Sequence, residues 1–188
     1  MRFILASSSP GRKRLFELFN MPFEVYSPSC DESEKKQEKP KDYVSRVALM
    51  KNEVAAVQFP DAYILSADTV VIVGRKILHK TQNREEAYQH LQLLSGRRHC
   101  VYTAIVLRRP DQKIFSKLVQ AKVLFSMLSE VQIQNFLNTQ EWENKAGSYD
   151  VLGTACCFIR QLIGNHTTIQ GLPMFQLSQL LRGVGLIP

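Results

Sequence analysis

The stretch FILASSSPGRKRLFELF, residues 3–19, joins a short apolar run to a helical pattern through a serine-rich turn. The run Phe3 to Ala6 is bounded by serines and predicts a buried strand. Ser9 is a good N-cap, Pro10 suits the first helical position, and the leucines and phenylalanines that follow recur at the spacing of one helical face. The chain is therefore predicted to open with a strand-turn-helix unit.

Strands and helices alternate along the rest of the chain. Further strands are predicted over residues 23–27, 63–73, 99–107 and 115–125, and further helices over residues 41–57, 83–94, 129–137 and 173–181. The strongest strand is 63–73, because its second half is apolar at every position. Asn83 and Glu86 have the spacing of a capping box, as do Ser129 and Gln132. This order, without internal repeats, predicts an α/β fold with a mixed central sheet and flanking helices.

Length and composition set the class of protein. The chain has 188 residues, of which 45% are hydrophobic and 22% are charged. This excludes collagen-like, coiled-coil and disordered chains, and we expect one domain over residues 1–188, compact or elongated around a cleft. No apolar run approaches the roughly 20 residues of a membrane helix, and the N-terminal run is too short for a secretory signal. A cytoplasmic protein without a membrane partner is expected.

The spacing of the cysteines and the distribution of charge limit the ligands and partners that the chain is expected to bind. The cysteines, at positions 30, 100, 156 and 157, form no C-x-x-C pair, which argues against a zinc site and a disulfide framework and predicts reduced, buried structural thiols. The net charge is +7, but the basic residues are scattered in short groups. Proteins that wrap nucleic acid show basic stripes with interleaved aromatics. A small phosphorylated substrate is favoured over a stable nucleic-acid partner.

The turn after the first strand has the features of a phosphate site. Free backbone N–H groups and the positive end of the helix dipole meet there, and Ser7, Ser9, Arg12 and Lys13 add donors and charge. No Walker A motif is present. Taken alone, the turn is equally well explained as a serine-rich helix cap.

A polar island interrupts the strongest strand. Asp68 lies in Ser66-Ala67-Asp68-Thr69, and an inward carboxylate there is costly without a partner. It could bind a divalent cation together with Glu32, or take a proton from an attacking water. The alternative is a turn hydrogen bond at a strand end. Lys51 lies among small and apolar residues and could reach inward, although such lysines usually extend to solvent.

Other catalytic patterns are absent from the sequence. The histidines, at positions 79, 90, 99 and 166, have no metal-ligand spacing and are expected to be surface or packing residues. There is no G-x-S-x-G elbow, and no base is evident beside the adjacent cysteines. Covalent catalysis is not indicated.

Seven blocks of the sequence, in this order, closely resemble the Maf family of nucleoside triphosphate pyrophosphatases. They are LASSSPGRKRLFELF (5–19), DE (31–32), SADTVV (66–71), ILHK (77–80), LSGRRHCVYTAIVL (94–107), EWENKAGSYDVLG (141–153) and IQGLPMFQL (169–177). The resemblance covers nearly the whole chain. It implies hydrolysis of the α–β phosphoanhydride bond of a nucleoside triphosphate, giving a nucleoside monophosphate and pyrophosphate, with a divalent metal such as Mg, Mn or Co.

The resemblance also implies roles for matched residues. Asp68 would be the general base and, with Glu32, would hold the metal. The remaining residues would bind the substrate or neutralise its charge: Ser7, Ser9 and Arg12 at the phosphates, Lys51 and Lys80 as added cations, and Lys145 near the site. Metal and cations together would neutralise the charge that builds on the leaving pyrophosphate.

Departures from the family pattern concern substrate choice. The subgroup that acts on dTTP and UTP carries Arg, Thr and Gln where this chain has Gly11, Thr69 and Leu152. The subgroup that acts on 7-methyl-GTP carries Trp, Gln and Glu there, and none of these is present. Leucine offers only contact area where an amide could pair with a base. Thr69 and the intact KAGSY block (145–149) favour the pyrimidine subgroup, but modified nucleotides stay open.

The fold implied by the resemblance is elongated and two-lobed around a cleft, as in inosine triphosphate pyrophosphatases. A homodimer is compatible with it. Two alternatives to the enzyme remain: a nucleotide-binding regulator of cell division and septum formation with little or no catalysis, and a basic nucleic-acid-binding module. The combination of Asp68, Glu32, Lys51 and Lys80 favours the enzyme, because a sensor needs no general base.

Overall fold

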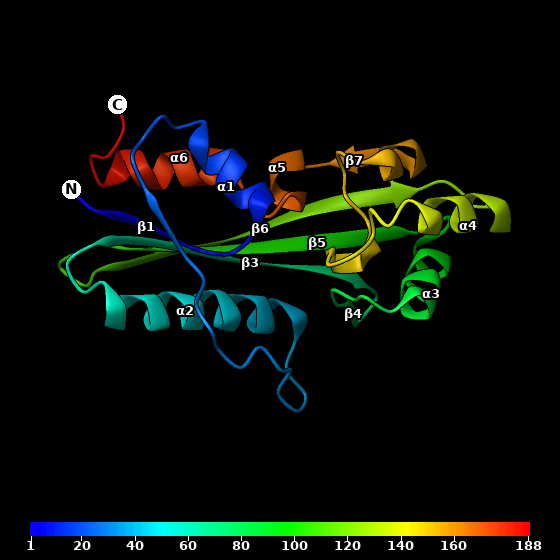
Figure 1. Cartoon of the computed structure of the whole chain (residues 1–188), viewed down its shortest axis with the longest axis horizontal. Helices are drawn as coiled ribbons and strands as arrows, with labels where there is room; N and C mark the ends of the chain where they lie inside the picture. Colours follow the sequence, from blue (N-terminus) through cyan, green and yellow to red (C-terminus); the bar gives the residue numbers. More distant parts are fainter.

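Three long antiparallel strands run along the length of the molecule in the computed structural model, which describes residues 1–188 (Figure 1). They belong to a seven-stranded sheet of order β2-β1-β3-β5-β6-β7, with β4 paired to β3. The strands are β1 (Phe3–Ala6), β2 (Glu24–Tyr26), β3 (Tyr63–Val73), β4 (Lys76–Leu78), β5 (Arg98–Arg108), β6 (Ile114–Phe125) and β7 (Ile159–Ile163). β1 is parallel to β2 and β3, and all other pairs are antiparallel. The predicted mixed sheet is confirmed.

Helices cover both faces of the sheet. They are α1 (Pro10–Glu17), α2 (Pro40–Gln58), α3 (Arg84–Leu94), α4 (Glu130–Asn138), α5 (His166–Ile169) and α6 (Met174–Gly183), with 3-10 helices η1 (Ala146–Ser148) and η2 (Thr154–Phe158). α1, α5 and α6 lie on one face, and α2 lies on the other (Figure 1). Phe16 of α1 and Leu177 of α6 are fully buried in one apolar cluster, and Val47 of α2 is fully buried in another.

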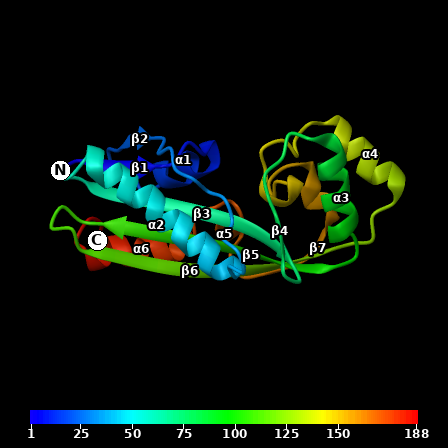
Figure 2. The same cartoon turned by 90° about the horizontal axis from the view of Figure 1, so that it is seen from below.

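A second lobe lies at the end of the sheet farthest from the two termini (Figure 2). There α3, α4, η1 and η2 surround a separate apolar cluster of 16 buried residues, which includes Leu91, Phe136 and Trp142. β5 and β6 contribute to both lobes, because their residues appear in clusters at both ends. The expected elongated, two-lobed α/β fold is thus confirmed.

One edge of β3 is left open where the two lobes meet. β1 pairs with Tyr63–Ser66, and β4 pairs with Val71–Val73. Between them, Ala67–Val70 have no strand partner on that side, although β5 pairs with the other side. The polar island of the sequence therefore lies at a break in the sheet edge.

Most predicted elements agree with the structure, but one predicted cap differs. Ser129 and Gln132 form the capping box of α4. At α3, the Asn83 side chain accepts from the Glu85 and Glu86 amides, as expected of an N-cap. The carboxylate of Glu86 instead accepts a hydrogen bond from Thr81 Oγ1 at 2.6 Å. Thr81 Oγ1 also accepts from the Asn83 N–H at 2.9 Å, so threonine replaces the glutamate in the predicted box.

The expectation of buried cysteines is wrong. All four thiols are free, but Cys156 and Cys157 are exposed and the other two are partly exposed. The adjacent pair lies in η2, a short surface helix in which only Ala155 and Phe158 are buried. Strands β4 and β7 and the short helices η1, η2 and α5 have no counterpart among the predicted elements. No helix has the length and apolarity needed to cross a membrane.

Candidate functional site

A cavity of about 840 Å³ opens at the break in the β3 edge. It is lined by residues from both lobes. They come from the β1–α1 turn and one face of α1, the 27–32 loop, Lys51, Thr69, Val71, Lys80, the 143–152 segment and the 166–171 segment. Most of the residues singled out in the sequence therefore converge on one cavity, although they are spread over 146 positions from Ser7 to Leu152.

The N-terminus of α1 forms one wall of the cavity. Ser9 is the N-cap, and its side chain accepts a hydrogen bond from the Arg12 amide at 3.4 Å. Ser7 and Gly11 line the same wall. The serines therefore cap the helix and also face the cavity, so the two explanations of this turn are compatible. The helix end supplies a partial positive charge.

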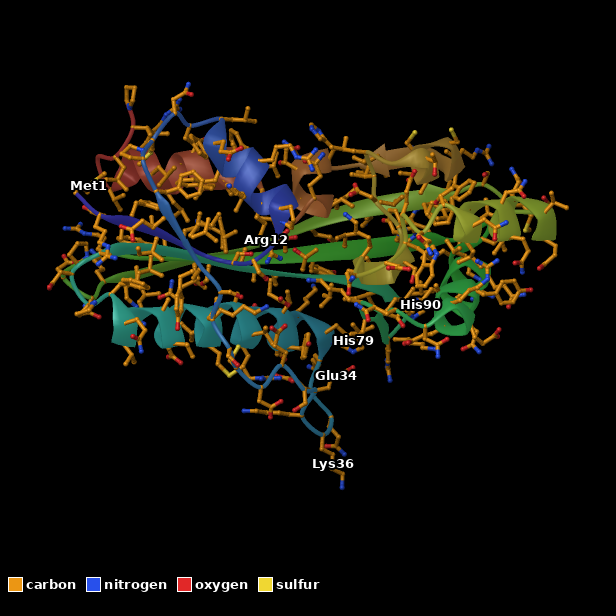
Figure 3. All side chains as sticks on the ribbon, in the orientation of Figure 1. Met1, Arg12, Glu34, Lys36, His79 and His90 are labelled. Atoms are coloured by element: carbon orange, nitrogen blue, oxygen red, sulfur yellow. The ribbon has the colours of Figure 1, made fainter.

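Arg12 is buried, with 5% of its surface exposed, and lies at the start of α1 over the sheet (Figure 3). Its Nε donates to the carbonyl oxygen of Gly171 at 2.8 Å, its Nη1 to Ser7 Oγ at 3.1 Å, and its Nη2 to Thr69 Oγ1 at 3.1 Å. Burial lowers the pKa of Arg12, while the nearby carboxylates of Asp68 and Glu32 oppose that shift. An arginine remains charged under these conditions, so a fixed guanidinium faces the cavity.

Lys51 joins two carboxylates beneath the break in the sheet. Its Nζ donates to Asp68 Oδ1 at 2.8 Å and to Glu32 Oε2 at 2.9 Å. Lys51 is only 8% exposed and Asp68 only 7%, whereas the Glu32 side chain is 47% exposed. The alternative of a lysine extending to solvent is excluded. So is a turn role for Asp68, which lies within β3 opposite Ala104.

Asp68 and Thr69 point to opposite faces of β3, as neighbours on a strand must. Asp68 meets Lys51 of α2, and Thr69 meets Arg12 of α1. Because the sheet edge is open at these residues, groups from both faces reach the same cavity. Asp68 itself does not line the cavity, but it accepts a hydrogen bond from Lys51, which does.

Lys80 adds a further cation from the segment after β4. It is exposed and lines the cavity. Desolvation of the ammonium by its surroundings lowers the pKa of Lys80, and repulsion from Arg12 and Lys51 lowers it further. Asp68 and Glu32 act in the opposite direction. Lys80 is therefore electrostatically coupled to both carboxylates and both buried cations of the site.

The opposite wall comes from the 143–152 segment. Lys145 Nζ lies 2.8 Å from Asp150 Oδ2, and Leu152 is 63% exposed at the cavity. Partial burial favours the neutral form of Asp150, but hydrogen bonds from Lys145 and the Leu152 amide outweigh it and lower the pKa of Asp150. The positive charge of Lys145 is therefore neutralised by Asp150, which belongs to the same wall of the cavity.

Of the basic residues in α1, Arg14 lines the cavity and the predicted Lys13 does not. Lys13 is exposed, lies 4.0 Å from Glu17 and does not line the cavity. Arg14 does line it, on the same helix face as Gly11 and Leu18. Positions three or four apart share a face of a helix, so this spacing was the available signal for Arg14.

Metal ligands are limited to two carboxylates. No group of three or more His, Cys, Asp or Glu side chains could hold an ion. Glu32 and Asp68 converge on Lys51 Nζ within 2.9 Å and could supply oxygen ligands. Protein sites for Mg²⁺ commonly offer one or two carboxylates and leave the remaining positions to water and substrate phosphates. The donor set therefore fits a cation that arrives with a phosphorylated substrate.

Comparisons with known proteins give a consistent result. The Maf-like protein family matches residues 2–184. A dTTP/UTP pyrophosphatase of Rhizobium etli is 41% identical over 191 residues, covering 98% of this chain and 93% of that protein. A dTTP/UTP pyrophosphatase of Maricaulis maris is 42% identical over 185 residues, covering 98% and 88%.

Solved structures show the fold over almost the whole chain. A HAM1 protein from Coxiella burnetii superimposes with a TM-score of 0.58 at 13% identity, covering 97% of this chain and 99% of that one. A nucleoside-triphosphatase, also titled dITP/XTP pyrophosphatase, from Mycobacterium abscessus gives a TM-score of 0.50 at 14% identity, with 98% of both chains covered. At such identities the likeness concerns the fold alone.

Proposed function

The chain belongs to the Maf family, and we propose that it is a nucleoside triphosphate pyrophosphatase that hydrolyses the α–β phosphoanhydride bond. The products are a nucleoside monophosphate and pyrophosphate. The observation that carries this proposal is the cluster in which Lys51 holds Asp68 and Glu32 beside the cavity that Arg12 and Lys80 also face.

Phosphate binding is assigned to the α1 wall. A guanidinium has five N–H groups, and three of those of Arg12 are used by Gly171, Ser7 and Thr69. Two remain for phosphate oxygens. The helix end, the Ser7 and Ser9 hydroxyls and the Lys80 ammonium add to the binding of a triphosphate. Preorganised cations of this kind stabilise the charge that develops on the leaving pyrophosphate.

Asp68 is assigned the role of general base. Its Oδ1 accepts from Lys51, which fixes the carboxylate in one orientation and leaves the second oxygen available to take the proton of an attacking water. Lys51 also holds Glu32, so one lysine orders both acids. Glu32 and Asp68 would hold a divalent cation such as Mg²⁺, Mn²⁺ or Co²⁺. When bound, the cation would neutralise phosphate charge.

A pyrimidine nucleotide is the proposed substrate. The relatives named above are dTTP/UTP pyrophosphatases, and Thr69 lines the cavity as the pyrimidine pattern requires. Gly11 and Leu152 also lie at the cavity but carry no hydrogen-bonding side chain. We propose that the base is held there by contact with Leu152 and by polar groups other than those two positions.

The first experiment compares the wild type with Asp68→Asn. Pyrophosphate release is measured from a panel of canonical and modified nucleoside triphosphates with Mg²⁺, Mn²⁺ or Co²⁺. We expect release from dTTP and UTP, a loss of at least about 100-fold in kcat for Asp68→Asn, and retained nucleotide binding. Asp61→Asn, at an exposed position before β3, is the matched control and should behave like the wild type.

Two results would contradict the proposal in different ways. Wild-type turnover in Asp68→Asn would remove Asp68 from the mechanism. Nucleotide binding by the wild type without any pyrophosphate release would favour the nucleotide-binding regulator over the enzyme.

A further inference from the structure

Behind Thr69 lies a second threonine that the proposed mechanism does not use. Thr103 of β5 is the register partner of Thr69 in β3 and is fully buried. Its Oγ1 lies 2.9 Å from Thr69 Oγ1 and 2.7 Å from the carbonyl oxygen of Thr168. Thr69 Oγ1 in turn lies 3.1 Å from Arg12 Nη2. These contacts form a chain from a backbone carbonyl to the guanidinium at the cavity.

The direction of each hydrogen bond in this chain follows from counting protons. A carbonyl oxygen only accepts, so the single hydroxyl proton of Thr103 goes to Thr168. Thr103 must therefore accept from Thr69, and the single proton of Thr69 is committed to Thr103. A guanidinium only donates, so Thr69 accepts from Arg12. One acceptor position of Thr69 is left, and no donor.

Thr69 is partly exposed and lines the cavity, so its remaining lone pair is available to a ligand. We infer that Thr103 is a positioning residue that makes Thr69 present only an acceptor to the nucleotide, and so selects a base whose ring nitrogen N3 carries a hydrogen. This inference rests on the proposed binding of a nucleotide at Thr69. Thymine and uracil have an N3–H donor, whereas N3 of cytosine is an acceptor. The arrangement therefore favours thymine and uracil over cytosine.

The same chain also anchors Arg12. Thr69 is one of the three groups that hold the guanidinium, and Thr103 fixes the orientation of the Thr69 hydroxyl. Loss of the Thr103 hydroxyl is therefore expected to raise KM as well as to change base preference. A change in base preference is the effect that a merely structural role of Thr103 would not produce.

The test compares Thr103→Val with Thr103→Ser. Valine keeps the shape of the side chain but removes the hydroxyl, so the Thr69 proton is free to face the cavity. Serine keeps the hydroxyl and therefore the hydrogen bonds to Thr69 and to the Thr168 carbonyl. We measure kcat/KM for UTP and CTP, and the affinities of their non-hydrolysable α,β-methylene analogues by calorimetry. The preference for UTP over CTP should fall about tenfold in Thr103→Val, the size of one hydrogen bond, and should be retained in Thr103→Ser.

Ser66→Ala is the matched control. Ser66 is also fully buried, and its hydroxyl donates to the carbonyl oxygen of Ala48 at 2.7 Å, but it has no link to Arg12. It should lose stability comparably and keep the base preference. Thermal unfolding of each variant verifies folding.

The outcomes separate the inference from the proposed function. A preference unchanged in Thr103→Val, or reduced equally in Ser66→Ala, would overturn the inference. So would equal wild-type affinity for the two analogues. If the wild type binds the uracil analogue preferentially but hydrolyses neither triphosphate, the proposed enzyme fails. In that case a smaller binding preference for the uracil analogue over the cytosine analogue in Thr103→Val would still support the role of Thr103 in orienting Thr69.

Discussion

Among single residues, Lys80 shows how the site controls a charge. Partial desolvation of its ammonium and repulsion from Arg12 and Lys51 lower the pKa of Lys80 below the ordinary 10.5. Deprotonation removes a cation from the proposed phosphate site. Lys80 is charged below its pKa and loses its charge as the pH rises through it, so substrate capture should weaken on the alkaline side.

We expect kcat/KM to fall with rising pH before the pH at which an ordinary lysine titrates, mainly through KM. Lys80→Arg should move this alkaline fall to higher pH, because a guanidinium remains charged. Lys13→Arg, at the exposed position outside the cavity, is the control and should keep the wild-type profile. Superimposable alkaline profiles for Lys80→Arg and the wild type would assign the titration to another group.

At the scale of elements, the turn at η1 depends on the absence of a side chain. Gly147 has a φ of +68°, and a Cβ placed there would lie 2.8 Å from Cγ1 of Val71 in β3. This close approach sets the 143–152 wall against the strand that carries the site. Gly74 in the β3–β4 turn has a similar φ of +62° but nothing within 4 Å of a Cβ.

The two glycines form a matched pair of tests. Gly74→Ala should lose about 1 kcal/mol of unfolding free energy, which is the cost of a left-handed backbone alone. Gly147→Ala should lose about 2–4 kcal/mol, because the overlap with Val71 must also be relieved. Urea unfolding measures both losses. Gly147→Ala should also raise KM by displacing the wall, and equal destabilisation by the two substitutions would show that Val71 moves without cost.

At the scale of the whole molecule, His99 couples stability to pH. It is 1% exposed in the second lobe, where its Nε2 lies 2.9 Å from the Tyr149 hydroxyl. Burial lowers the pKa of His99 to about 4. Between that value and the ordinary pKa of about 6.5, the unfolded chain takes up a proton that the folded protein does not. The contribution to stability is present above pH 6.5 and is lost as the pH falls toward 4.

We expect His99 to account for a loss of about 2 kcal/mol in unfolding free energy between pH 7.5 and pH 5. Urea titrations of wild type and His99→Gln at these two pH values measure it. The glutamine variant should start lower in stability and lose less between them. His166→Gln, at an exposed position, serves as the control. An equal pH dependence in wild type and His99→Gln would refute the assignment.

Local chemistry in the sequence determined most of the elements. The run 3–6 became β1, and Ser9 with Pro10 started α1, because capping and apolar periodicity act within a few residues. The motifs of the Maf family identified many of the cavity residues between Ser7 and Leu152, but not Arg14. Short elements such as β7 and η1 could not be predicted from periodicity. β7 forms by pairing with β6, and η1 depends on a left-handed backbone at Gly147.

Only the tertiary structure decided how these residues face one another. Lys51 points inward because Asp68 and Glu32, distant in sequence, converge on its ammonium. Arg14 rather than Lys13 faces the cavity because α1 packs on the sheet with one particular face. The Thr103–Thr69 pair exists through the β3–β5 register. The physical reason is that helix and strand formation are local, whereas side-chain orientation, desolvation and hydrogen-bond direction depend on neighbours that only folding brings together.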